Sequence, residues 1–234
     1  MSSANSPTGN RLLDRLPKAD RRALGERCET VALRRGAKVY QSDSAIEHVY
    51  FPTTAVCSLV VGMADGEVAE AGMIGNEGML GLPAYLGAET ALHTVLAQRA
   101  GGALRMPVEA FHDFLRESPR FEKLVQRYVA YSWRYANQTV ACNALHSVEK
   151  RACRWLLLTH DRVGDGDFVL THEFLAEMLG THRQTVSIVA ATLQRSGLIR
   201  YRRGVVRILK RAELEGSSCE CYAISKQLYR ELIR

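Results

Sequence analysis

The spacing of apolar and polar residues divides the chain into stretches with different periods. Between Val31 and Met106, turn residues separate short runs rich in β-branched and aromatic residues, among them AKVYQ, HVYFP, AVCSLVVGM, TVLAQ and ALRMP. Many short strands at close spacing are typical of a β-sandwich or a barrel-like roll. Upstream, LPKADRRALGERCE has helical spacing, and residues 1–10, rich in Ser, Asn, Gly and Pro, predict a disordered tail.

The period becomes helical after Met106, and from Pro119 onward no residue breaks it for about 25 positions, which is long for a helix that only packs within a domain. Two apolar stripes run along this stretch at the alternating spacing of a coiled coil. One stripe is expected to cover the β-domain and the other to meet a second copy of the helix, and the sequence does not say which. The first stripe, assigned to the dimer helix, contains Leu124, Tyr128, Tyr131, Tyr135, Gln138, Cys142 and Leu145; the second contains Val125, Val129, Ser132, Ala136 and Val140.

A second helix, SVEKRACRWLLLTHDRV, is followed by a turn at residues 165–167 and by FVL, which is short enough for a small strand. Thr171 then has the position of an N-cap, and Gly180 can supply the positive φ that ends a helix. Thr181 and Gln184 fit a capping box that starts another helix. Two short helices joined by a glycine turn predict a helix-turn-helix, whose second helix fits the DNA major groove.

The segment after the second short helix predicts a wing. Gly197 ends that helix, and LIRY and VVRIL are short strands joined by the basic tip RRG. Between Thr181 and Arg211 there are eight Arg or Lys and no Asp or Glu, while the whole chain has a net charge of +6, leaving about −2 for the remainder. A localised basic face on a near-neutral remainder is the electrostatic pattern expected of a protein that binds a polyanion.

Base reading is expected from the exposed side of the second short helix, near its N-terminus. The guanidinium group of Arg183 can donate two hydrogen bonds to O6 and N7 of guanine, a contact worth about 1–3 kcal/mol of discrimination against the wrong base. Gln184 could pair with adenine or be occupied by the capping box, and the sequence leaves both open. The weaker base-reading candidates are His182, Ser187 and Ile188, and phosphate contacts are expected from Thr171, Thr181, Arg195, Arg202 and Arg203.

The order of β-roll, long helix and winged helix resembles the Crp/Fnr family of bacterial transcription regulators, most specifically in THRQTVSIVAATLQRSGLI. The resemblance covers the chain from about Leu16 to Leu209. It implies that Arg183 and Gln184 read bases, that Thr185 contacts a phosphate, and that a homodimer binds a palindromic operator. Many relatives have Glu at the position of Gln184 and a second Arg at that of Ile188, so the half-site is expected to be unusual for the family.

The resemblance also gives a role to the glycine-rich loop GNEGMLGLPAYLGAETALHT, residues 75–94. In relatives that bind cyclic nucleotides, a Gly-Glu pair holds the ribose and an Arg-Ser or Arg-Thr pair holds the phosphate. By that match Glu77 takes the ribose role, but the phosphate pair falls at Ala91 and Leu92. The tentative effector pocket therefore comprises Gly75, Glu77, Gly78, Ala91, Leu92 and, on the long helix, Asn137.

No arginine lies between Arg35 and Arg99 to neutralise a phosphate in that pocket. A buried phosphate without a cationic partner carries a large desolvation cost, so a cyclic mononucleotide held in the family manner is not expected. Helix N–H groups alone can bind anions. A regulator that responds to cAMP or cGMP through an atypical phosphate site therefore stays open, as does one without a ligand.

The six cysteines are scattered, apart from Cys219-x-Cys221, and indicate free thiols rather than a disulfide framework. An iron–sulfur sensor would need clustered N-terminal cysteines, whereas only Cys28 and Cys57 precede the long helix. Cys219 and Cys221 with Cys153 could sense oxidants or hold a metal, but this spacing is too sparse to count as a site. We therefore expect no metal site and leave the cofactor unknown, with isolated His48, His93 and His112 as poor haem ligands.

The fold class predicted from these patterns is α+β. We expect a tail over residues 1–10, a jelly-roll-like β-roll over 11–117, a long dimerisation helix over 118–146 and a winged helix-turn-helix over 147–234. No catalytic motif such as HExxH or a phosphate loop with lysine is present, so we expect no enzyme. No membrane-length apolar run or signal peptide is found either. We expect a cytoplasmic regulator whose partners are double-stranded DNA, a second copy and RNA polymerase; a scaffold protein with a structural winged helix is the alternative class.

Overall fold

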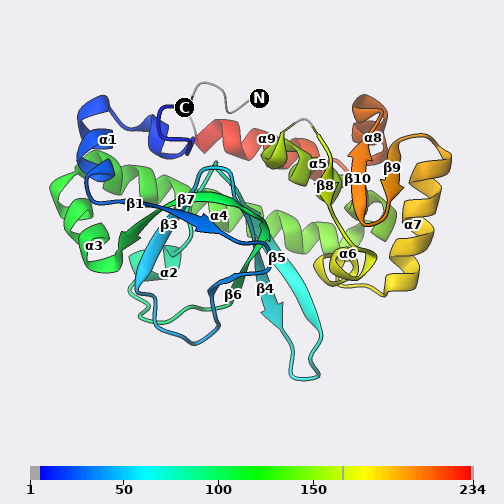
Figure 1. Ribbon diagram of the computed structural model, residues 1–234, viewed down its shortest axis with the longest axis horizontal. Helices are drawn as coiled ribbons and strands as arrows, with labels where there is room; N and C mark the ends of the chain where they lie inside the picture. The colour runs from blue at the N-terminus through cyan, green and yellow to red at the C-terminus, as the bar shows by residue number, and fades with distance from the viewer. Residues whose placement is uncertain (1–5, 165, 233–234) are drawn as a thin grey trace. The chain divides into compact units, whose positions relative to one another are not determined.

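The computed structural model describes residues 6–164 and 166–232 (Figure 1). Residues 1–5 of the predicted tail and Asp165 of the predicted turn lie outside the described residues. The chain divides into two compact units, described separately below. The C-terminal unit comprises Val60–Ala71 and Arg134–Tyr229, and the N-terminal unit contains residues 6–59 and Gly72–Trp133.

Two sheets form the β-roll, as the α+β prediction requires. The first has the strand order β1-β7-β3, in which β7 pairs antiparallel with both neighbours, and the second has the order β2-β6-β4-β5. The strands are β1 (Glu29–Leu33), β2 (Lys38–Tyr40), β3 (His48–Pro52), β4 (Val56–Gly62), β5 (Val68–Ile74), β6 (Thr94–Arg99) and β7 (Gly101–Pro107). The helical elements of this region are η2 (Leu13–Arg15), α1 (Lys18–Gly25), α2 (Leu82–Tyr85) and α3 (Val108–Glu117).

One hydrophobic cluster of the N-terminal unit lies between the first sheet and its helices, and another includes Tyr40, Cys57, Val95 and Ala97 of the second sheet. Val49 of β3 is opposite Met106 of β7, and both side chains are fully buried because alternate residues of a strand face the same side. Phe111 of α3 meets Phe121 edge to face, with ring centres 5.7 Å apart. Aromatic pairs of this geometry add stability beyond their buried area.

Residues 6–10 belong to the fold, contrary to the predicted disordered tail. Asn10 is fully buried and donates from Nδ2 to the carbonyls of Pro52 and Gly78, at 2.8 and 2.9 Å. Its Oδ1 accepts from the backbone N–H groups of Leu12 and Leu13, each at 3.1 Å. A polar composition predicts exposure on average. One asparagine whose side-chain amide makes all its hydrogen bonds can nevertheless anchor such a segment in the interior.

The predicted long helix is α4 (Pro119–Leu145), 27 residues, with Ser118 Oγ accepting from Phe121 N at its start. Leu124, Val125 and Tyr128 are buried in the core of the N-terminal unit. Most of the first apolar stripe thus faces the chain's own interior, since Tyr135 and Cys142 are buried as well and Tyr131 is half-buried, whereas Leu145 at its end is 79% exposed. Assigning Leu124, Tyr128, Tyr131, Tyr135 and Cys142 to a dimer contact is corrected accordingly, because residues the chain itself covers are not available to a second copy.

The opposite face of α4 is exposed and partly apolar. Trp133 is 71% exposed and Val140 69%. Ala136 and Ala144 are exposed as well, and the spacing of three or four residues places all of these side chains on one face. Two members of the second predicted stripe, Ala136 and Val140, therefore lie on the open face of the helix.

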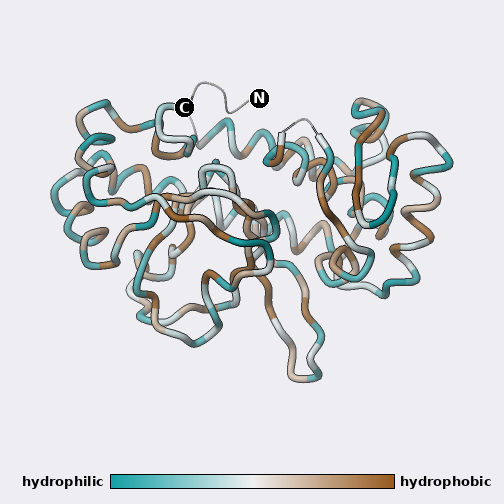
Figure 2. The backbone as a smooth tube through the Cα atoms, in the orientation of Figure 1, coloured by the Kyte–Doolittle hydropathy of each residue, from teal (hydrophilic) through white to brown (hydrophobic). Residues whose placement is uncertain are grey.

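The C-terminal unit contains the helix-turn-helix and a small sheet of order β8-β10-β9. Figure 2 shows apolar segments interleaved with polar ones along its helices, the pattern of amphipathic elements around a core. Leu156, Leu175, Val186 and Val206 are among its buried residues. The elements are α5 (Val148–Val163), β8 (Phe168–Val169), α6 (His172–Leu179), α7 (Arg183–Arg195), β9 (Ile199–Arg202), β10 (Val205–Ile208), α8 (Arg211–Ser217) and α9 (Cys221–Leu232).

The border between the two units differs from the predicted one. The predicted border lies near His146 and Ser147, where the helical period is interrupted, and Ser147 does cap α5 by accepting from Lys150 N. In the structure, the border between the N-terminal and the C-terminal unit instead falls between Trp133 and Arg134, inside α4. A helix that packs against different partners along its length has no break at the point where those partners change. Among the described residues, no helix combines the length and apolar character needed to cross a membrane.

Candidate nucleic-acid interface

The first helix of the helix-turn-helix, α6, has the ends that the sequence predicts. Thr171 is the N-cap, and its side chain accepts from Phe174 N at 3.1 Å. Gly180 has φ 57° and donates from its N–H to the carbonyl of Glu177, while Thr181 N donates to that of Ala176. This pair of bonds is the Schellman motif, in which glycine adopts the left-handed conformation that ends the helix.

The second helix, α7, starts differently from the prediction. Its N-cap is His182, and no side-chain cap bond forms there among the described residues. The expected capping box between Thr181 and Gln184 is therefore wrong. Thr181 is already committed to closing α6 through its backbone, which places the start of α7 one residue later. Of the two possibilities for Gln184, the structure removes the capping one.

The exposed side of α7 carries most of the predicted base readers. His182, Arg183 and Gln184 are exposed at its start, and Ile188, 67% exposed, lies one turn further on. Thr185 is half-buried, a position compatible with a backbone phosphate contact. The opposite side packs into the unit through Val186, Ala190 and Leu193, all buried. This is the amphipathic arrangement that a recognition helix requires.

Two contacts connect α7 with α6. Arg183 Nε lies 2.9 Å from Glu173 Oε1, an ion pair between two exposed side chains. Ser187 Oγ donates to the carbonyl of Arg183 at 3.0 Å and lies 2.9 Å from His172 Nδ1. The Ser187 hydroxyl is thus used inside the motif, which makes it a poorer base reader than expected.

The His172 ring also stacks on Tyr201 of β9, with ring centres 4.6 Å apart and planes inclined by 27°. Burial, and then the nearby Arg183, lower the pKa of His172, so the neutral ring is favoured. The Tyr201 hydroxyl donates to the carbonyl of Leu170 at 2.8 Å. These contacts join α6, α7 and the first wing strand.

The wing is a two-residue hairpin between β9 and β10. Its loop residues Arg203 and Gly204 have φ values of 51° and 74°. Positive φ at both central residues is typical of the type I′ turn, whose twist matches that of the paired strands. Arg202 ends β9 opposite Val205, so two exposed guanidinium groups lie at the tip, as predicted.

Several of the eight cations of this segment are neutralised by acids from elsewhere in the chain. Arg183 pairs with Glu173, Lys210 with Glu213, and Arg207 with Asp167, whose pKa the guanidinium lowers. Arg195, Arg202 and Arg203 have no acidic partner in the part of the chain that the structure describes. The basic face is smaller than the count in the sequence suggests, and it is concentrated at the end of α7 and on the wing.

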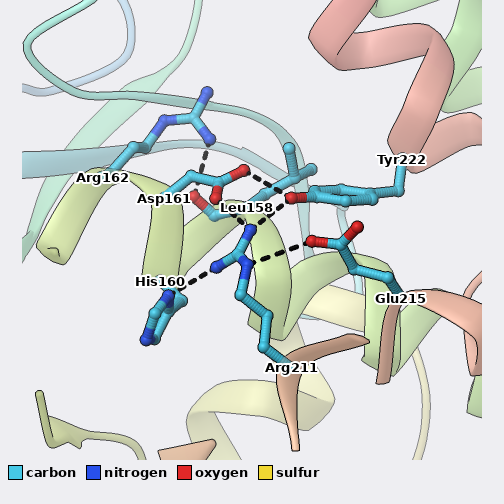
Figure 3. Close-up of polar contacts among 7 residues, drawn as sticks. All are labelled: Leu158, His160, Asp161, Arg162, Arg211, Glu215 and Tyr222. Carbon is cyan, nitrogen blue, oxygen red and sulfur yellow. Dashed lines mark hydrogen bonds and ion pairs between the residues drawn. The ribbon is translucent and has the colours of Figure 1, made fainter. Parts of the chain in front are cut away.

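Arg211 lies in a polar network rather than on the basic face (Figure 3). Its guanidinium contacts Asp161 at 2.5 Å, Glu215 at 3.0 Å and His160 at 2.6 Å. The Tyr222 hydroxyl accepts from Arg211 and donates to Asp161, at 2.6 and 2.9 Å. The network joins α5, α8 and the start of α9, and it gives Arg211 a structural role.

The glycine-rich loop of the N-terminal unit is shaped by packing. A Cβ at Gly78 would lie 2.0 Å from the Tyr128 hydroxyl, so the close approach of α4 alone requires glycine there. Glu77 is buried, and its Oε1 accepts from Gly75 N at 3.3 Å. The carboxylate thus has a partner within its own loop.

The predicted phosphate position also lacks the groups that a phosphate would need. Ala91 is 3% exposed, and its backbone bonds to Ser44 and Asp43, whereas Leu92 is 65% exposed. His93 is half-buried, and burial lowers its pKa, which disfavours the cationic form. Asn137, the sixth residue of the tentative pocket, is exposed and belongs to the C-terminal unit.

Sequence reasoning missed a cluster at the end of α4. Cys142 and His146 lie beside Cys219 and Cys221, and their ligand-type atoms are all within 4.8 Å of one another. The sequence suggests Cys153 as the partner of Cys219 and Cys221, but Cys153 is not a member of the cluster. The missed signal is Cys142-x-x-x-His146, since a helix brings residues four apart to one face.

Comparisons with known proteins agree with this architecture. A sequence model of the cyclic nucleotide-binding domain matches residues 30–118, and one of the Crp-like helix-turn-helix domain matches residues 150–216. The two matches together cover about two thirds of the chain. A search of curated proteins gives no significant match.

Solved structures of similar fold come from several bacteria. FixK2 from Bradyrhizobium japonicum has a TM-score of 0.71 at 15% identity, covering 82% of this chain and 98% of its own. CLP from Xanthomonas campestris, described as a c-di-GMP responsive global regulator, has a TM-score of 0.66 at 14% identity over 82% and 99% of the two chains. A CRP-family transcriptional regulator from Thermus thermophilus has a TM-score of 0.66 at 22% identity, with the same coverages of 82% and 99%.

A β-roll that matches the cyclic nucleotide-binding domain, a long helix and a Crp-like helix-turn-helix define a transcription regulator rather than an enzyme. The chain belongs to the Crp/Fnr family. Regulators of this family bind DNA through the helix-turn-helix and act as dimers.

Proposed function

We propose that this chain is a homodimer that binds a palindromic operator, with α7 in the major groove and the wing on the phosphate backbone. The observation that carries the proposal is the exposed start of α7, where Arg183 and Gln184 face outward and the Gln184 amide is not used in a cap. Arg can read guanine and Gln adenine through paired hydrogen bonds. Ile188 offers an apolar contact to a thymine methyl group.

Phosphate binding would come from groups that the fold leaves uncommitted. Arg195, Arg202 and Arg203 are exposed and have no acidic partner among the described residues. The hydroxyls of Thr171, Thr181 and Thr185 supply neutral donors near the two helix starts; Thr171 Oγ1 accepts a cap bond but keeps its O–H free to donate. These contacts fix the register of the protein on DNA without reading its sequence.

The proposed dimer contact is the open face of α4. Trp133, Ala136, Val140 and Ala144 lie on one side of a 27-residue helix, opposite the buried stripe. Two such faces can pack about a two-fold axis, and a two-fold dimer reads a palindrome. A role in transcription would also make RNA polymerase a partner of this chain and the cytoplasm its compartment.

For the effector domain we propose that no cyclic mononucleotide binds in the manner of its nucleotide-binding relatives. Glu77 has a partner in its own loop, and Ala91 and Leu92 offer no cation. Lys38, the one lysine between Arg35 and Arg99, is bonded to Gln41 at 2.7 Å. Calorimetric titration with cAMP and cGMP should give no binding heat; saturable micromolar binding would overturn this statement.

The test of the main proposal is selection of binding sites from random duplex DNA by the purified chain. We expect an enriched sequence with two inverted half-sites, whose centres lie about one or a whole number of helical turns apart, roughly 10 base pairs or a multiple. A footprint on the selected duplex should cover both halves. Enrichment of no sequence, or of a single half-site bound by one chain, would contradict it.

A further inference from the structure

Four side chains from two separate segments converge in the C-terminal unit. Cys142 lies in the last turn of α4 and His146 directly follows the helix, while Cys219 precedes α9 by two residues and Cys221 is its first residue. The three cysteines are buried, at most 3% exposed, and the His146 side chain is 15% exposed. Cys142 Sγ lies 3.5 Å from Cys219 Sγ, and Cys221 Sγ lies 3.6 Å from His146 Nδ1.

The Sγ–Sγ distance of 3.5 Å and the Sγ–Nδ1 distance of 3.6 Å are close to those between the ligands of a tetrahedral zinc ion. With Zn–S bonds of about 2.3 Å and Zn–N bonds of about 2.05 Å, tetrahedral angles separate two sulfurs by about 3.8 Å and a sulfur from a nitrogen by about 3.6 Å. All four ligand-type atoms lie within 4.8 Å of one another. A disulfide would instead hold its two sulfurs at about 2.05 Å.

We propose that Cys142, His146, Cys219 and Cys221 bind one Zn²⁺ ion per chain. Three thiolates and one imidazole form the Cys₃His set of structural zinc sites, in which protein ligands fill all four positions. Soft sulfur ligands in tetrahedral array select zinc over magnesium or calcium, which take oxygen ligands in larger numbers. Binding requires deprotonated thiols, so uptake of the ion releases protons.

The neighbours of the cluster suit a bound metal. His146 Nε2 lies 3.3 Å from Glu220 Oε2, so the ring can donate to a carboxylate while Nδ1 faces the sulfurs. Metal-binding histidines commonly make this second contact, which fixes the tautomer and the ring orientation. Gln138 Nε2 donates to Cys221 Sγ at 3.1 Å, a bond that a thiolate accepts better than a thiol.

Arg154 supplies the balancing charge. A Zn²⁺ ion with three thiolates carries a net charge of −1, which is costly to bury alone. The Arg154 side chain is 7% exposed, its Cζ lies 5.6 Å from the centre of the Tyr135 ring, and it donates to Thr139 Oγ1 at 3.1 Å. Burial alone would lower its pKa, whereas thiolates at Cys142, Cys219 and Cys221 would raise it. Its Nε is buried without a hydrogen-bond partner among the described residues. Arg154 has no acidic side-chain partner in the part of the chain that the structure describes, and a zinc–thiolate centre would provide the counter-charge.

The site would tie the end of α4 to the segment that follows the wing. Cys142 and Cys219 are 77 residues apart, so one ion would close a long loop and restrict the unfolded chain. The ion would add to the Arg211 network, which already joins α9 to α5 through Tyr222. Its role is to fix α9 (Cys221–Leu232) in place, independently of whether the chain binds DNA.

The first test measures metal on the full chain expressed with zinc and purified under reducing conditions. Elemental analysis should give one zinc per chain, released by a mercurial reagent that blocks thiols. Cobalt added to the metal-free chain should give the visible bands of tetrahedral Co²⁺ and a thiolate charge-transfer band in the near ultraviolet. Zinc added afterwards should abolish both, and a chain that takes up neither metal under reducing conditions would overturn the proposal.

Variants identify the ligands. Cys142→Ser, Cys219→Ser and Cys221→Ser should each lower zinc affinity by more than about 100-fold, beyond the 10–100-fold typical of losing a group that only supports a ligand. His146→Cys should keep one zinc and strengthen the cobalt charge-transfer band, because a fourth thiolate replaces the imidazole. Cys28→Ser, a half-buried thiol of the other unit, is the matched control and should keep full uptake. Uptake that survives loss of both Cys219 and Cys221, or that Cys28→Ser removes, would overturn the assignment.

Discussion

Arg183, the first residue of α7, is held by Glu173 of α6, with Nε 2.9 Å from Oε1. Both side chains are more than half exposed, so the pair contributes little to folding stability, about 0–1 kcal/mol. The pair matters because it lies at the exposed start of α7. The residue best suited to read guanine has an acidic partner beside it when DNA is absent, and a base edge must compete with that partner.

Glu173→Gln should therefore raise affinity for duplex DNA of any sequence. The substitution removes a negative charge beside the phosphates and releases Arg183, and the gain should shrink as salt is added because screening weakens both effects. Fluorescence anisotropy with a scrambled duplex at two salt concentrations measures it. Glu213→Gln, which frees Lys210 away from α7, serves as the matched control. Weaker binding by Glu173→Gln would mean that the carboxylate positions Arg183 rather than competing with DNA.

Arg183→Ala should strongly reduce preference for the selected operator while weak binding to scrambled DNA persists. The expected loss on the operator is about 1–3 kcal/mol per half-site, since a paired guanine contact disappears. The comparison is the ratio of operator to scrambled affinity for the variant and the wild type. Arg200→Ala, a change of the same charge on β9 outside α7, should leave that ratio unchanged. A variant that kept full sequence preference would show that other residues read the operator.

The wing should act on all sequences alike. Replacing Arg202 by Ala and Arg203 by Asn removes two cations; Asn is chosen because residue 203 has φ 51°, where Asn fits and Ala is strained. Affinity should fall equally on operator and scrambled duplex, and the slope of log K against log salt should become shallower by about two per chain. A selective loss on the operator would place base contacts on the wing.

Much of the helix-turn-helix could be predicted because the residues that begin and end its first helix act locally. Thr171 and Gly180 each act within a few residues of their own position, so the sequence shows where α6 begins and ends. The predicted capping box at Thr181 is wrong although its hydroxyl suits an N-cap. The backbone N–H of Thr181 instead donates to the carbonyl of Ala176 at the end of α6. Two roles competed for one residue, and only the geometry shows which prevails.

Features that depend on distant pairing could not be predicted. Asp167 and Asp161, which pair with Arg207 and Arg211, lie 40 and 50 residues away, so counting charges along one segment overestimated its basic face. The two stripes of α4 have similar apolar content, and nothing in their spacing shows that Leu124 faces the core while Val140 faces outward. The convergence of Cys142 with Cys219 follows from how α9 folds back along the unit, which no local pattern encodes.

Trp133→Glu combined with Val140→Glu should give a folded monomer. Both side chains are exposed, so the substitutions cost the monomer little, but they bring like charges together across a two-fold contact. Size-exclusion chromatography with light scattering should show half the wild-type mass, and operator affinity should fall to that of one half-site. Leu86→Glu, an exposed leucine outside α4, should remain dimeric. A dimer that survived the double change would move the contact to another surface.

Acid should weaken the folded chain partly through His172. Its pKa in the folded state lies below the ordinary 6.5, because of burial and then Arg183, with Glu173 acting in the opposite direction. As the pH falls from 7.5 towards 5.5, the unfolded chain therefore binds the proton first, and the free energy of unfolding decreases. His172→Gln removes this titration, so its melting temperature should fall less than that of the wild type over the same range. His182→Gln, at an exposed histidine, is the control and should keep the wild-type fall. An equal fall in all three proteins would show that the stacked ring does not contribute to the pH dependence.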